Sequence, residues 1–194
     1  MSANFPHHLK AGLRLPLNHN LCRHQRVKLA QTMRAHLLVS LHADVLNNRS
    51  VRGASVYWPS PKSSDAQAEE FATNNNLVVS AGSIDTHELP LGVSAIMEDL
   101  IFREKQVFSF EIQRSMVTAL GRRVPLLKNP ERHGNFLLLR TGNIPSILLE
   151  MGFRSNLKDE ALLNDNDDQH KIVLGSVEAI IVCVHRFAAV GFTQ

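Results

Sequence analysis

The chain has few of the residues that mark small disulfide-bonded proteins or membrane proteins. It holds two cysteines, Cys22 and Cys183, whose wide separation gives no metal-ligand spacing. We expect Cys183, in an apolar stretch near the C-terminus, to be a small buried hydrophobic residue. No stretch approaches 18 consecutive apolar residues, so the sequence predicts no membrane span. Its first residues show neither the apolar core nor the cleavage site of a signal peptide.

Acidic residues are absent from the first 41 positions. The first 58 positions hold eight lysines and arginines but one acid, Asp44. This basic segment is compatible with an anionic partner, such as nucleic acid or an acidic cell-wall glycan, and equally with an ordinary solvated surface. Aromatic residues do not alternate with these charges, which argues against a platform for single-stranded nucleic acid. We therefore expect no nucleic-acid partner.

Length and apolar patterning predict a single α/β domain. The 194 residues are 44% hydrophobic, which is enough for one buried core. We expect residues 1–21 to be an irregular lead-in and residues 22–194 to form the domain, a twisted and largely parallel sheet flanked by helices. The predicted strands are 37–41, 53–58, 136–139 and 147–149. The predicted helices are 23–35, 64–73 with a capping box of Ser64 and Gln67, 93–120, and 171–190 packed on the sheet.

Two of the predicted strands end in an ionisable residue. The apolar run 37–41 is followed by His42, and the run 147–149 is followed by Glu150. If the strands are parallel neighbours, the imidazole and the carboxylate share one cleft at the strand tips, where open α/β sheets place their chemistry. This pair suggests metal-assisted hydrolysis, with Glu150 as a general base. Taken singly, each residue is more often structural.

Three motifs give the chain a family resemblance. They are SLHAD at 40–44, VRGASVYWPSPKSSDAQAEEFA at 51–72 and NIPSILLEMGFRSN at 143–156. Together they resemble the zinc-dependent N-acetylmuramoyl-L-alanine amidases, of the cell-separation type found in Gram-negative bacteria. The resemblance implies cleavage of the bond between N-acetylmuramic acid and L-alanine in peptidoglycan, with His42 as a zinc ligand and Glu150 as the catalytic residue. It also implies a periplasmic location and a possible activator protein of the divisome.

The sequence departs from the family pattern at the metal site. The family holds zinc with a His, a Glu and a second His, and His42 matches the second His. The motif that carries the first His does not occur here, and no Glu precedes His42. The chain thus resembles an N-terminally truncated member that lacks the family's first strand, with an incomplete zinc site. Two alternatives follow: an inactive truncated member, or a non-catalytic module that binds peptidoglycan or an activator.

An inserted segment around 74–120 begins with a loop that lacks any periodicity. In the cell-separation amidases, an insertion at this place can carry an inhibitory acid that occupies the zinc until a partner removes it. By this resemblance Asp85 and Glu88 are candidates for an inhibitory segment. Ordinary solvated loop acids are the alternative.

Overall fold

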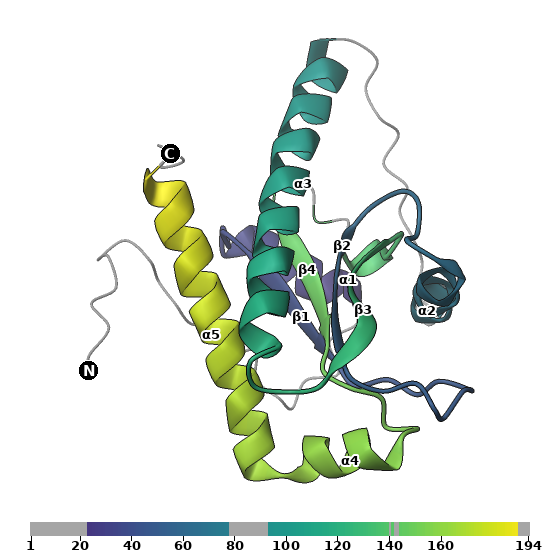
Figure 1. Ribbon diagram of the computed structural model, residues 1–194. Helices are drawn as coiled ribbons and strands as arrows, with labels where there is room; N and C mark the ends of the chain where they lie inside the picture. The colour runs from purple at the N-terminus through teal and green to yellow at the C-terminus, as the bar shows by residue number, and fades with distance from the viewer. Residues whose placement is uncertain (1–22, 78–92, 140, 142–143, 190–194) are drawn as a thin grey trace.

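The structure is a computed structural model that describes residues 23–77, 93–139, 141 and 144–189. A four-stranded sheet lies between helices on both faces (Figure 1). The strands are β1 (Leu38–His42), β2 (Ala54–Pro59), β3 (Leu126–Gly134) and β4 (Ser146–Glu150). The helices are α1 (Arg23–Thr32), α2 (Ala66–Leu77), α3 (Val93–Leu120), α4 (Leu157–Asn164) and α5 (Asn166–Ala189).

The sheet has the order β1-β4-β2-β3. β1 pairs with β4 in parallel, and β2 pairs with β3 in parallel, whereas β2 and β4 are antiparallel. The expected α/β fold with a largely parallel sheet is confirmed, and the antiparallel pairing between β2 and β4 is an addition. Because of this pairing, the end of β4 lies beside the start of β2.

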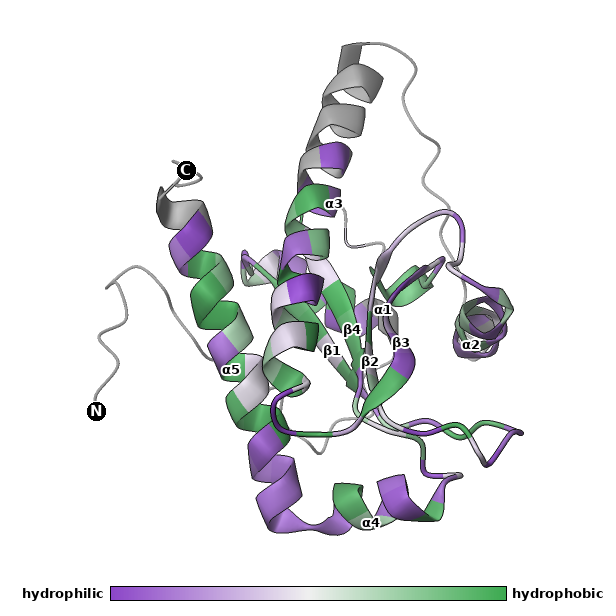
Figure 2. Ribbon diagram, in the orientation of Figure 1, coloured by the Kyte–Doolittle hydropathy of each residue, from purple (hydrophilic) through white to green (hydrophobic). Residues whose placement is uncertain are grey.

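β4 is the most buried strand of the sheet. All five of its residues are buried, as expected for a continuous apolar run with helices on both faces. Ile147 and Leu149 belong to the cluster beneath α3, while Leu148 belongs to a second cluster with Phe71 of α2. Figure 2 shows the hydrophobic strands at the centre of the molecule. Since side chains alternate along a strand, Glu150 lies on the α2 side of the sheet.

Four of the helices follow the predicted patterns, with two corrections, whereas α4 was not predicted. The side chain of Asp65, not of Ser64, accepts the bond from the backbone N–H of Ala68 (2.8 Å) and caps α2. The predicted capping box is therefore wrong by one residue. The last helix begins at Asn166 and packs chiefly along α3 (Figure 1), with the buried Cys183 in the shared core. The helices within the described residues include none that is long and apolar enough to cross a membrane.

The region 126–139 differs from the prediction. Residues 126–134 form the edge strand β3, which the sequence did not predict because its centre, 128–131, is polar and includes Pro130. The register of its pairing with β2 shifts between Ala54 and Val56, so the pairing is irregular there. The predicted strand 136–139 is wrong: Leu137–Leu139 is a 3₁₀ turn, in which the N–H of Leu139 donates to the carbonyl of Phe136.

Candidate metal centre

The candidate site lies where β1 and β4 end. His42 and Glu150 are register partners at the last position of the two strands, and the N–H of Met151 donates to the carbonyl of His42 (3.0 Å). The expectation that the two strand tips meet is therefore confirmed. Residues 108 positions apart in sequence become neighbours because both strands are apolar and pair in parallel.

Glu150 is a fully buried carboxylate with one oxygen to spare. Its Oε1 accepts a bond from the backbone N–H of Asp44 (3.1 Å), and Oε2 has no hydrogen-bond partner among the described residues. Burial, and then the nearby charge of Asp44, raise the pKa of Glu150 well above its ordinary value. Backbone N–H groups of Asp44 and Gly152 oppose this rise only in part. A buried oxygen of this kind is suited to accept a proton or face a cation.

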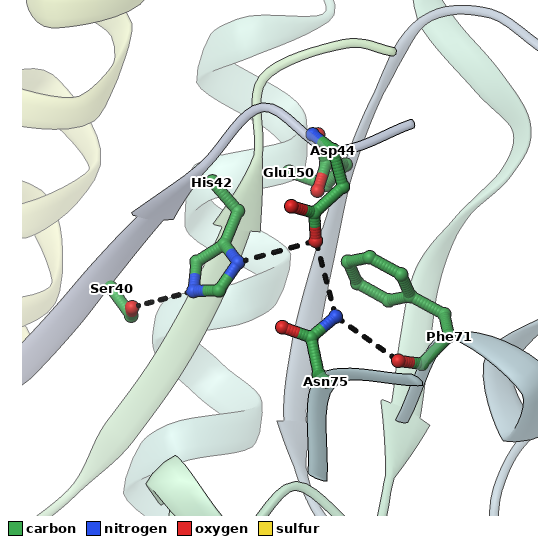
Figure 3. Close-up of polar contacts among 6 residues, drawn as sticks. All are labelled: Ser40, His42, Asp44, Phe71, Asn75 and Glu150. Carbon is green, nitrogen blue, oxygen red and sulfur yellow. Dashed lines mark hydrogen bonds and ion pairs between the residues drawn. The ribbon is translucent and has the colours of Figure 1, made fainter. Parts of the chain in front are cut away.

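His42 is held between two polar side chains. Its Nε2 lies 3.0 Å from Ser40 Oγ, and its Nδ1 lies 3.4 Å from Asp44 Oδ2 (Figure 3). Asn75 of α2 donates to the same Asp44 oxygen (3.1 Å) and to the carbonyl of Phe71 (3.0 Å). The side chains of His42, Asp44 and Glu150 therefore converge beside the first helix that follows β2.

The loop after β4 supports the loop after β1. The N–H of Arg154 donates to the carbonyl of Asp44 (2.9 Å), and the N–H of Leu46 donates to Ser155 Oγ (3.1 Å). Because the backbone of Asp44 is bonded on both sides, to Arg154 and to Glu150, its carboxylate is placed by tertiary structure and not only by β1.

The three side chains fit a divalent cation. Each offers one ligand atom, and these atoms lie within 4.8 Å of one another. Two ligands of a tetrahedral zinc at its usual bond lengths are about 3.3 Å apart. The 3.4 Å between His42 Nδ1 and Asp44 Oδ2 is long for a hydrogen bond and close to that separation. One imidazole and two carboxylates are also a donor set that suits zinc and other first-row divalent cations.

The structure thus brings together the two residues that the sequence singled out for chemistry. Asp85 and Glu88 lie outside the described residues, so their inhibitory role stays a prediction. Asp44, Ser40 and Asn75 were not predicted as site residues. The sequence could have indicated Asp44, because it closely follows the strand-terminal histidine. Nothing in the sequence indicated Asn75, because α2 reaches the site only through tertiary packing.

Solved structures with the same fold are amidases. The N-acetylmuramyl-L-alanine amidase of Mycobacterium smegmatis matches with a TM-score of 0.59 at 20% identity, over 85% of this chain and 61% of that one. The CwlD amidase of Clostridioides difficile, solved in complex with the GerS lipoprotein, matches with a TM-score of 0.55 at 22% identity, over 84% of this chain and 61% of that one. At these identities the likeness establishes the fold.

Sequence comparison finds relatives in the same family. N-acetylmuramoyl-L-alanine amidase AmiC of Escherichia coli O6:H1 is 30% identical over 87% of this chain and 39% of the relative. AmiC of Neisseria meningitidis serogroup B is 32% identical over 71% of this chain and 33% of the relative. The chain thus spans less than two fifths of the length of these relatives. The profile of the N-acetylmuramoyl-L-alanine amidase family matches residues 13–182, and the chain belongs to that family.

Proposed function

We propose that the chain hydrolyses the amide bond between N-acetylmuramic acid and L-alanine in peptidoglycan, during cell-wall turnover and cell separation. The observation that carries the proposal is the buried Glu150, with a spare oxygen, beside His42 and Asp44 in a domain of this family. Because peptidoglycan lies outside the cytoplasmic membrane, we place the activity in the periplasm.

His42 and Asp44 are the proposed holders of a zinc ion. The tautomer in which His42 Nε2–H donates to Ser40 Oγ leaves the lone pair of Nδ1 directed at the carboxylate side of the site. Asn75 donates to Asp44 Oδ2 and so fixes the rotamer of that carboxylate. A bound zinc ion would supply Lewis-acid polarisation of the scissile carbonyl and lower the pKa values of neighbouring acids.

Glu150 is the proposed general base. Its Oε1 is fixed by the N–H of Asp44, so Oε2 is the oxygen that takes the proton of the attacking water. The same oxygen then returns the proton to the amine of L-alanine as the amide bond breaks. Burial keeps the carboxylate away from bulk water, so the proton stays with the reacting groups.

The test is release of stem peptides from purified peptidoglycan by the zinc-loaded chain. We expect Glu150→Gln to lower kcat by about 10²-fold to 10⁴-fold, the usual contribution of a general base, without loss of zinc. The matched control is Glu160→Gln, which changes an exposed acid ten positions further on. Equal rates for the two variants would contradict the role of Glu150. Binding of peptidoglycan without turnover would instead support the non-catalytic module.

An activator protein is a further part of the proposal. The solved complex of the CwlD amidase with the GerS lipoprotein gives an amidase of this fold a protein partner. For this chain we propose an activator of the divisome that displaces an inhibitory segment containing Asp85 and Glu88. Removal of both carboxylates should raise the activity measured without any partner.

A further inference from the structure

Asp159 is a buried acid, although α4 does not need a buried acid at this position. It lies in the first turn of α4, where Asn156 already caps the helix by accepting bonds from Lys158 and Asp159. An acid in this turn is favourable while exposed. Asp159 is instead only 2% exposed, although burial of a carboxylate costs free energy unless its oxygens are bonded. Its bonds therefore indicate what it does.

The carboxylate of Asp159 joins two loops. Oδ2 accepts bonds from the backbone N–H of Gly53 (2.7 Å) and of Phe153 (3.1 Å), and Oδ1 lies 3.4 Å from Nε of Arg52. Gly152 packs directly against it: a Cβ atom at Gly152 would lie 3.3 Å from the carboxylate, and φ is +152°. A residue with a side chain at position 152 would therefore press on the carboxylate.

Both loops lead to the candidate metal centre. Phe153 precedes Arg154, whose N–H donates to the carbonyl of Asp44, and the N–H of Asp44 donates to Glu150 Oε1. Gly53 precedes β2, in which Ser55 is the register partner of Glu150. Oδ2 of Asp159 thus holds the backbone N–H of Gly53, just before β2, and that of Phe153, in the loop after β4. These two segments lie on either side of Glu150.

We propose that Asp159 is a positioning residue, which holds Asp44 and Glu150 in the geometry that binds the cation and accepts the proton. This inference rests on the proposed function of the same site. The acceptor oxygen of Asp159, and not its ion pair with Arg52, does this positioning, because the side chain of Arg52 is 35% exposed and the ion pair is screened by water.

Amide hydrogen exchange on the metal-free chain tests the positioning directly. In Asp159→Leu, which removes the acceptor, the amides of Asp44 and Arg154 should exchange at least about tenfold faster than in the wild type. The amide of Leu149 within β4 should not change, which separates local loosening from global unfolding. In Asp159→Asn, which keeps an acceptor oxygen, all three rates should stay within about threefold. Unchanged exchange of Asp44 and Arg154 in Asp159→Leu overturns the proposal.

Zinc affinity, measured by competition with a chelator, is the second readout. Asp159→Leu should weaken zinc binding at least tenfold, while Asp159→Asn and the control Asp168→Leu should leave it nearly unchanged. Asp168 suits this control because it is also a first-turn helix acid, but its side chain is 30% exposed. A wild-type chain that holds no zinc would overturn the proposed metal chemistry, and hydrogen exchange would still decide the role of Asp159. If Asp159→Leu does not fold, Asp159→Ala, which also removes the acceptor oxygen, replaces it, with the same expected changes and the same overturning result.

Discussion

Replacement of Glu150 by glutamine should change how the stability of the metal-free chain depends on pH. Glu150 is fully buried, and burial together with the charge of Asp44 raises its pKa well above 4.5. In the unfolded chain the same carboxyl titrates near its ordinary value. Between these two pKa values the folded chain therefore carries a proton that the unfolded chain has lost.

The sign and the slope follow from this difference in bound protons. As pH rises above about 4.5, the free energy of unfolding should fall by up to about 1.4 kcal/mol per pH unit because of Glu150 alone. The stabilisation that Glu150 contributes is fully present below its pKa in the unfolded chain. It is lost as pH rises to its pKa in the folded chain, and above that pH the free energy of unfolding no longer changes because of Glu150. Glu150→Gln cannot titrate, so the slope that Glu150 contributes should be absent from the variant.

Urea unfolding at pH 5, 6 and 7 in the presence of a chelator gives the required free energies. The difference between the wild type and Glu150→Gln should shift steadily in favour of the variant as pH rises. Other ionisable groups are present in both proteins, and their contributions cancel in the difference as long as they do not depend on Glu150. Parallel pH profiles for the two proteins would refute the raised pKa and the burial argument behind it.

Two further predictions concern the scaffold. Gly53→Ala should lower the free energy of unfolding by about 2 kcal/mol or more, because φ is +97° and the new Cβ would lie 2.5 Å from the backbone carbon of Leu126; urea unfolding measures the loss, and wild-type stability would contradict the strain. Burial raises the pKa of the Cys183 thiol to about 11, so in a Cys22→Ser background it should not react with a thiol reagent at pH 8 until the chain unfolds; rapid labelling of the folded chain would contradict its burial.

The sequence predicted the two strands that carry the chemistry because their signal is local. Residues 147–149 are a short apolar run with an ionisable residue at its end, and the same pattern precedes His42. Their short length and the turn residues beside them favour a strand over a helix, which is usually longer. The polar centre of β3 gave no such signal, because an edge strand buries less and tolerates Pro130.

The third member of the candidate metal centre was harder to predict. Asp44 is positioned by the N–H of Arg154 and by Glu150, both more than 100 residues away in sequence. Asn75 reaches the site only because Phe71 and its neighbours pack α2 onto the sheet. Contacts of this kind depend on the arrangement of elements, which local periodicity does not specify.

The position of β4 in the sheet also constrains how the protein is made. β4 lies between β1 and β2, so these two strands do not pair with each other. Both pair with β4, which is synthesised about a hundred residues after them. Until then the nascent chain exposes two unpaired strand edges, which are sites for aggregation. Since His42 and Glu150 meet only when β4 inserts, the metal centre is among the last parts of the domain to form during biosynthesis.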